Sequence, residues 1–230
     1  MIKNIKGTKD LLPETTYNVQ DIENHLNRFM HMHGYGEIRT PIFESTELFR
    51  RSVGEDTDIV NKEMYTWEDQ NGQSLTLRPE MTASVVRAYI QKQLWKIEPI
   101  SKFYYIGPSF RRERPQKGRL RQFHQFGVEA IGSYNPEQDA EIISIAYNIY
   151  QMFGVNQLSI KINTLGSNNI RNKYIEELKK ILSKFKSIFN ESEYNRLQKN
   201  PLRILDSKNK DIQELTDKHA PNIFDYISSD

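Results

Sequence analysis

Hydrophobic residues recur at helical spacing in three stretches of the chain. Residues 13–33 have apolar positions three and four apart, which predicts a long helix that Gly34 would end. A second helix is expected after Pro79, and a third from Asn135, a capping residue followed by Pro136 and acidic residues. The apolar faces expected for these helices are Val19, Ile22, Leu26, Phe29 and Met30; Ala83, Val86, Tyr89 and Ile90; and Ile142, Ile145, Ala146, Ile149 and Phe153.

Between the helices, apolar and polar residues alternate as they do in strands. Residues 35–44 form an extended segment interrupted by Pro41, which removes a hydrogen-bond donor, so this strand should lie at a sheet edge or pair only partly. Residues 63–78 are typical of a β-hairpin whose turn is Asn71-Gly72. Further strands are expected in residues 101–107, in the arms of residues 110–129 and in residues 158–163.

The pattern changes after Gly166, where polar links separate helical segments and few strand signals remain. We therefore expect two domains, residues 1–167 and residues 168–230. Hairpin spacing of the strands predicts an α+β fold in which a mostly antiparallel sheet is flanked by helices.

Composition excludes several classes of protein. The chain has 230 residues, 32 Lys and Arg against 30 Asp and Glu, a net charge of +2 and no cysteine. These values argue against a nucleic-acid coat, disulfides and thiolate metal sites. The histidines lack carboxylates at ligand spacing, so no metal site is expected. No apolar run has signal-peptide or membrane-spanning length, which predicts a cytoplasmic protein without membrane contact.

Residues 110–129 are the most informative stretch. Six cations lie between Arg111 and Arg121 against one acid, Glu113, and arginine side chains grip phosphate oxygens in pairs. Phe123 offers a ring for a base, and the polar residues after it offer contacts for a small ligand. A nucleotide-plus-substrate site is therefore one interpretation, and a solvated basic hairpin or RNA-contacting loop is the other. Within this stretch, the residues Gln122, His124, Gly127 and Glu129 are taken to alternate with Phe123, Gln125 and Val128.

Other candidate residues are less specific. Glu80 and Thr82 should lie at a helix N-terminus, where they either cap the helix or bind an ammonium group. His124 is expected to be a packed or hydrogen-bonded strand residue. Glycine-rich P-loop and Rossmann motifs and a nucleophile elbow are absent from the sequence.

Several motifs together resemble the bacterial type of histidyl-tRNA synthetase, a class II aminoacyl-tRNA synthetase. The resemblance covers nearly the whole chain. Tyr35-Gly-Glu-Ile-Arg-Thr-Pro41 is similar to motif 1, and the basic stretch from Phe110 to Gln125 is similar to motif 2. The other similar segments are Gly7-Thr-Lys-Asp-Leu-Leu-Pro13, Val53-Gly-Glu-Asp-Thr-Asp58, Lys62-Glu-Met-Tyr65, Leu75-Thr-Leu-Arg-Pro-Glu80 and Asn200-Pro-Leu-Arg-Ile-Leu-Asp-Ser-Lys208, the last within an insertion domain.

The resemblance implies a class II catalytic core, the start of a helical insertion domain and a homodimer formed through motif 1. It also implies activation of L-histidine by ATP with Mg²⁺, followed by transfer to tRNA-His. Arg111 would be catalytic, bridging the histidine carboxylate and the α-phosphate. Histidine would be bound by Glu80, Met81, Thr82, Arg111, Gln125 and Glu129, and ATP by Arg111, Glu113, Arg119 and Phe123. Met81 stands where many relatives have glycine and would act through its backbone.

The same resemblance implies that motif 3, a histidine-specific downstream segment and an anticodon-binding domain are not in this sequence. We therefore expect the 230-residue chain to be inactive alone. Two alternatives remain: a histidine-sensing paralogue like the regulatory subunit of ATP phosphoribosyltransferase, and a non-catalytic RNA-binding or interaction fragment.

Overall fold

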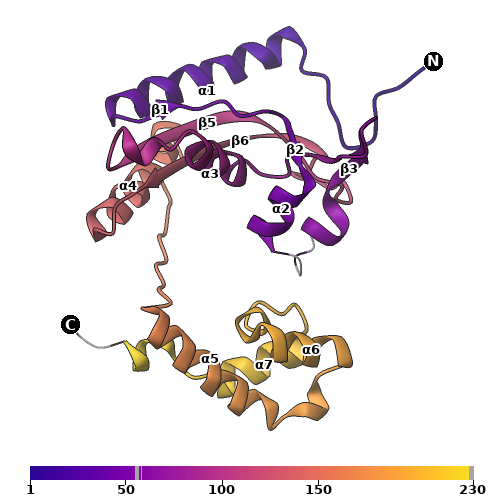
Figure 1. Cartoon of the computed structure of the whole chain (residues 1–230), viewed down its shortest axis with the longest axis vertical. Coiled ribbons are helices and arrows are strands. Elements are labelled where there is room, and N and C mark those ends of the chain that lie inside the picture. Colours follow the sequence, from indigo (N-terminus) through magenta and orange to yellow (C-terminus); the bar gives the residue numbers. More distant parts are fainter. Residues whose placement is uncertain (55–56, 58, 228–230) are drawn as a thin grey trace. The chain divides into compact units, whose positions relative to one another are not determined.

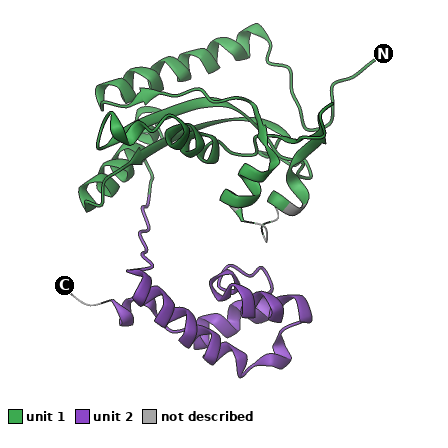
Figure 2. Ribbon diagram, viewed as in Figure 1, with its two compact units in different colours: residues 1–158 green, residues 159–230 purple. Residues whose placement is uncertain are grey.

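The computed structural model of the chain describes residues 1–54, 57 and 59–227. It divides into two compact units, Met1–Leu158 and Ser159–Asp230 (Figure 2). The expected domain limit between residues 167 and 168 lies nine residues after this division, directly before the first helix of the second unit, which begins at Asn168. Three residues of one sequence motif, Glu55, Asp56 and Asp58, lie outside the described residues.

The main sheet of the first unit has the order β1-β5-β6. β5 (Ser101–Phe110) pairs antiparallel with β6 (Gln122–Ile131) along all ten residues of each strand. β1 (Gly36–Glu37) pairs with β5 in parallel and forms one edge of this sheet, as the proline after it predicted.

A second sheet has the order β2-β4-β3 and is wholly antiparallel. Its strands are β2 (Phe43–Ser45), β3 (Tyr65–Glu68) and β4 (Ser74–Leu77). The predicted hairpin is β3–β4, and Gly72 in its turn has φ of +76°. Asp69 Oδ1 accepts the backbone N–H groups of Asn71 and Gln73, each at 2.9 Å, and so closes this turn.

Helices cover both faces of the main sheet (Figure 1). α1 (Pro13–Met32) and α4 (Pro136–Met152) bury Met30 and Ile145 against Tyr104 of β5. α3 (Thr82–Gln91) buries Val85 against Tyr105, on the opposite face of β5. The three predicted helices and the mostly antiparallel pairing are therefore confirmed. α2 (Thr46–Val53), a π-helical turn (Ile59–Glu63) and a 3-10 turn (Leu94–Lys96) complete the helical elements described in this unit.

All three predicted apolar faces are partly wrong, and in α1 the exception is Ile22, which is 44% exposed. In α3, Val85 is fully buried, whereas Val86 and Ile90 are 37% and 57% exposed. Only the first turn of α3 is deeply buried, so the packed side is the one that faces Tyr105. In α4, Ala146 and Phe153 are also exposed, because the sheet covers only the stripe around Ile145.

The strand predicted in residues 158–163 is wrong. These residues pair with no strand among those that the structure describes, and Ile160 and Ile162 are 50% and 69% exposed. Alternation alone does not make a strand, because the backbone groups of an extended segment need a neighbouring strand to bond.

The second unit is helical, as predicted. α5 (Asn168–Ser183), α6 (Glu191–Lys199) and α7 (Lys210–His219) have side-chain caps from Ser167, Asn190 and Asn209. Three 3-10 turns, Lys186–Ile188, Pro201–Ile204 and Ile223–Tyr226, link or follow these helices. Their shared core contains Tyr174, Leu178, Leu182, Phe189, Leu197, Ile204, Ile212, Leu215 and Ile223.

Candidate functional site

The face of the β5–β6 pair that carries Tyr105 brings most of the candidate residues together. Paired residues share a face, and the register matches Ser109 with Phe123, Gly107 with Gln125, Tyr105 with Gly127 and Phe103 with Glu129. Phe123, Gln125 and Glu129 therefore point to the same side. The alternation read from the sequence was wrong, because it placed Glu129 opposite Phe123 and Gln125.

Tyr105 is the centre of the amino-acid end of this face. Its hydroxyl donates to Glu129 Oε1 at 3.3 Å and lies 3.4 Å from Thr82 Oγ1. Burial, together with Glu129, raises the pKa of Tyr105 to about 12, so the hydroxyl remains a donor at neutral pH. Gly127 gives the ring its space, because a Cβ at that position would lie 2.3 Å from the ring.

Glu80 lies at the N-terminus of α3. Its Oε1 accepts the N–H of Ala83 at 3.0 Å. Glu80 therefore caps the helix, which was one of the two roles expected from the sequence. Thr82 is exposed at the same helix start, whereas Met81 is buried against Val85 and Tyr105. The capping bond does not use every acceptor position of the carboxylate, so Glu80 keeps capacity for a cation.

Arg111 connects the start of α3 with the basic loop. Its Nε donates to Pro79 O at 2.9 Å, next to Glu80 in the chain. Its guanidinium lies 5.3 Å from the ring centroid of Phe123, and Nη1 lies 3.9 Å from Glu113 Oε1. One face of the guanidinium is therefore held while the side chain remains half-buried at the surface of the site.

The rest of the basic loop is held by backbone hydrogen bonds, by the Arg121 side chain and by one ion pair. Arg119 Nη1 lies 3.2 Å from Glu113 Oε2, and the Arg119 N–H donates to Gln116 O at 2.9 Å. Gly118, with φ of +80°, makes the turn between them. Arg112, Arg114, Lys117 and Arg119 are exposed.

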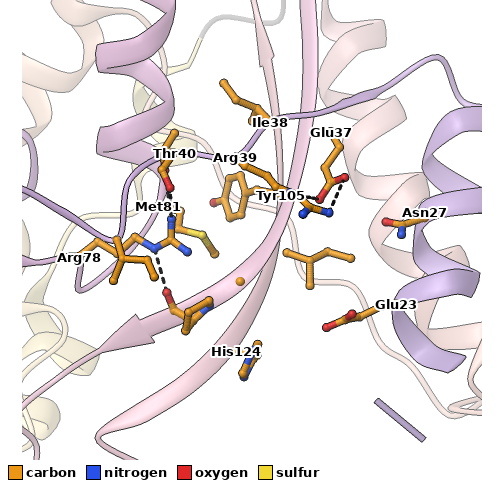
Figure 3. Close-up of a pocket in the computed structure, with 14 residues that line it drawn as sticks. Glu23, Asn27, Glu37, Ile38, Arg39, Thr40, Arg78, Met81, Tyr105 and His124 are labelled. Atoms are coloured by element: carbon orange, nitrogen blue, oxygen red, sulfur yellow. Dashed lines mark hydrogen bonds and ion pairs between the residues drawn. The ribbon is translucent and has the colours of Figure 1, made fainter. Parts of the chain in front are cut away.

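A buried arginine lies beside this site, on the same face of β5 as Tyr105. Arg78 is 5% exposed, and it donates to Pro108 O at 2.8 Å and Thr40 O at 2.9 Å (Figure 3). Burial lowers the pKa of the Arg78 guanidinium. Gly107 leaves room for this group, because a Cβ there would lie 2.6 Å from Arg78 Nη2.

Arg78 also lines a cavity of about 360 Å³ between α1 and the segment after β1 (Figure 3). Of the candidate site residues, only Met81 lines this cavity. His124 belongs to β6 as expected, but its side chain is exposed at the cavity wall instead of packed. Tyr105 and Gly107 also line the cavity, so it adjoins the face that carries Glu129 and Phe123, although neither of those two residues lines it.

Sequence reasoning missed Tyr105, Arg78 and Gly127 as parts of the site. Tyr105 lies in an aromatic-rich strand, where a tyrosine looks like an ordinary core residue. Only the register that faces it with Gly127 distinguishes it. No group of three or more His, Asp or Glu residues that could hold a metal ion occurs in the part of the chain that the structure describes.

Comparisons with known proteins show the family of the chain. The family model described as Histidyl-tRNA synthetase matches residues 7–221. The chain belongs to the histidyl-tRNA synthetase family. A histidine–tRNA ligase of Staphylococcus epidermidis is 50% identical over 232 residues, covering 100% of this chain and 54% of that protein. The structure of apo S. aureus histidyl-tRNA synthetase aligns with a TM-score of 0.78 and 41% identity over 100% of this chain and 51% of that one.

These relatives confirm the predicted family and the class II synthetase fold. The chain spans about half the length of the curated histidyl-tRNA synthetases it matches. A Bacillus halodurans structure described as an ATP phosphoribosyltransferase regulatory subunit/histidyl-tRNA synthetase aligns with a TM-score of 0.65 at 23% identity, which shows a shared fold alone. None of the helices formed by described residues is long and apolar enough to cross a membrane.

Proposed function

We propose that this chain supplies the motif 1 and motif 2 part of a histidine–tRNA ligase, in which L-histidine and ATP form histidyl-adenylate before transfer to tRNA-His. The observation that carries the proposal is the arrangement on one face of β5–β6. Arg111 is bonded to Pro79 at the start of α3 and also lies against the ring of Phe123. A carboxylate and a phosphate could therefore meet at this guanidinium.

The proposed histidine end is the group around Tyr105. Glu80 and Thr82 would bind the α-ammonium group, with Gln125 on the same face and Met81 contributing only its backbone. Glu129 would accept a hydrogen bond from the imidazole ring. The Tyr105 hydroxyl holds the Glu129 carboxylate at 3.3 Å, which fixes its orientation before the ligand arrives.

The proposed ATP end is the basic loop with Phe123. Phe123 would stack on adenine, Glu113 would accept from the adenine amine and Arg119 would bind phosphate oxygens. Arg119 and Glu113 are paired with each other at 3.2 Å, with the Arg119 side chain exposed and the Glu113 side chain largely covered. Binding of ATP would replace this ion pair with contacts to the nucleotide.

Adenylate formation suits this set of side chains. The attacking carboxylate is already ionised, so the reaction needs positioning and countercharge for the phosphoryl group. Arg111 would supply both when it bridges the two reactants. Mg²⁺ is expected to arrive on the phosphates of ATP, because the described residues offer no carboxylate cluster of their own.

The proposal includes a homodimer, with α1 and β1 as the contact elements, and a cytoplasmic location. The histidine-sensing alternative is not favoured, because the relatives at 49% and 50% identity are histidine–tRNA ligases. A sensor also has less use for a loop rich in phosphate-binding cations. The interaction-fragment alternative has no observation that favours it.

The test is histidine-dependent ATP–pyrophosphate exchange. The extended enzyme for this test is the present chain continued by the remaining sequence of the S. epidermidis relative. We expect exchange by the extended enzyme with histidine but not with other amino acids, and none by the 230-residue chain alone. The S. epidermidis enzyme serves as the positive control.

A folded extended enzyme without exchange would overturn the proposal, provided that the S. epidermidis enzyme is active in the same assay. Isothermal titration then separates the alternatives. Histidine binding without exchange would support a sensor. Binding of neither histidine nor ATP would support an interaction fragment.

A further inference from the structure

The N-terminal segment before α1 contains a compact turn. The Thr8 N–H and Oγ1 donate to Ile5 O at 3.0 and 2.7 Å, and Asn4 Nδ2 donates to Thr8 O at 3.1 Å. Gly7 occupies the third position of this turn with φ of +92°. Such a φ strains any residue with a Cβ, so the turn needs glycine there.

This turn is bonded to the far end of the basic loop. The Arg121 N–H donates to Gly7 O at 2.7 Å, and Arg121 O accepts the N–H of Arg111 at 3.0 Å. The Arg121 Nε donates to Glu113 O at 3.3 Å. Arg121 is therefore a connection between Gly7, the proposed catalytic Arg111 and the proposed adenine contact Glu113.

The fit between the turn and the loop is close. A Cβ on Gly7 would lie 2.8 Å from Arg121 Cγ and 2.9 Å from Pro115 Cγ. Both atoms belong to the loop, and real Cβ atoms do not approach carbon this closely. An alanine at position 7 must therefore push the turn and the loop apart, in addition to straining its own backbone.

We propose that the turn of residues 4–8 is a positioning element, the Gly7 clamp, that sets the conformation of the basic loop and thereby the affinity for ATP. Gly7 acts through Arg121 and does not touch a ligand. The structural part of this inference stands on the described contacts alone, whereas its effect on ATP rests on the proposed function.

The first test measures amide hydrogen exchange in the 230-residue chain. Gly7→Ala should speed exchange of the Arg121 and Arg111 amides at least tenfold. Gly34→Ala is the matched control, because Gly34 also has positive φ, +76°, but its Cβ would meet nothing within 4 Å. We expect no change in the loop amides of that variant.

A second variant covers the case in which Gly7→Ala fails to fold. Deletion of residues 1–8 removes the clamp but no member of the three core clusters, so the fold should remain. The same two amides should lose protection. If they exchange at the wild-type rate in the folded deletion variant, the clamp is overturned.

The second test measures kinetics in the extended enzyme. Gly7→Ala should raise the KM for ATP about tenfold while the KM for histidine changes less than twofold. General destabilisation would instead lower the amount of active enzyme and leave both KM values unchanged. An unchanged KM for ATP overturns the proposal, even if the loop amides lose protection. If the wild-type extended enzyme shows no ATP–pyrophosphate exchange, the proposed function fails. The amide hydrogen exchange of the 230-residue chain then still shows whether Gly7 holds the basic loop.

Discussion

At the scale of single residues, the site depends on glycines, which leave space, as much as on the side chains that fill that space. Gly127 faces Tyr105 across β5–β6, and Gly107 faces the guanidinium of Arg78. In each case, a larger residue would move a group that holds the site. Glycines in β5 and β6 therefore allow the Tyr105 and Arg78 side chains to lie where they do.

Tyr105→Phe tests the role of the hydroxyl. The change removes the donor to Glu129 Oε1 and leaves Thr82 Oγ1 without this neighbour. In the extended enzyme we expect the KM for histidine to rise about tenfold, which corresponds to one hydrogen bond to a charged group. The KM for ATP should change less than twofold. Equal effects on both KM values would contradict the placement of Tyr105 at the histidine end.

The same variant gives a pH signature of stability. The pKa of Tyr105 is raised to about 12 from an ordinary value of 10.0, so its contribution to folding is complete below pH 10 and is lost as pH rises towards 12. Urea unfolding of the 230-residue chain should show wild type more stable than Tyr105→Phe by about 1 kcal/mol at pH 8. This difference should shrink by pH 11.5. A constant difference would show that the hydroxyl does not titrate as described.

Arg111→Ala and Arg112→Ala form a matched pair in the basic loop. Arg111 is held against Pro79 and Phe123, whereas the side chain of Arg112 is exposed. In the extended enzyme, Arg111→Ala should reduce pyrophosphate exchange at least a hundredfold, because it removes the proposed countercharge. Arg112→Ala should reduce it less than tenfold. Equal losses would refute the residue assignment.

Among single residues, the sequence could identify Arg111 and Phe123 as candidates because cations and a ring near each other have a chemical meaning. It could not identify Tyr105, whose role depends on the pairing register. It also left open whether Glu80 caps α3, and the bond to Ala83 shows that it does. The ligand roles of all these residues remain predictions.

At the scale of elements, one polar network joins parts of the first unit. Lys102 of β5 lies 2.9 Å from Glu141 of α4, and Tyr35 donates to the same carboxylate at 3.2 Å. Hydrogen bonding to Lys102 is the main reason that the pKa of Glu141 lies below its ordinary value. The network therefore connects α4 with β5 and with Tyr35.

Lys102→Met tests this connection. A carboxyl with a lowered pKa stabilises the fold above its unfolded pKa, and this contribution is lost as pH falls through the folded value. Lys102→Met should therefore cost about 0.5–1 kcal/mol at pH 7, a modest value because both side chains are about 30% exposed. The cost should shrink below about pH 4. Urea titrations at pH 7 and pH 3 give the comparison, and an equal cost at both would contradict the ion pair.

Elements with local signals were predictable. The Asn71-Gly72 turn and the start of α4 at Pro136 depend on residues close in sequence. Residues 158–163 carried an equally clear alternation, yet they form no strand, because pairing depends on partners far away in the chain. The buried side of α3 was mistaken for the same reason, since it is set by Tyr105 of β5.

At the scale of the whole molecule, each unit has its own hydrophobic core. The core of the second unit draws only on residues of that unit, such as Leu178 and Leu197, which are both fully buried. The two units should therefore unfold independently.

Leu178→Ala tests this independence. The change removes a fully buried side chain and should destabilise the second unit by about 2–5 kcal/mol. Calorimetry should show a lower melting temperature for one transition and no shift in the other. The exposed position Ile188 provides the control, because Ile188→Ala should cost less than about 1 kcal/mol. A shift in both transitions would show that the units are coupled.

The outer edge of β6 has a consequence for how copies of this chain meet. β6 ends the order β1-β5-β6, so no strand of the described residues pairs with its second side. A straight row of unpaired amides and carbonyls can accept a strand from another molecule. Two copies that pair through this edge would each offer the same strand, so the contact would close at two copies. Such a pair would leave α1 and β1 uncovered, whereas the proposed homodimer would cover them.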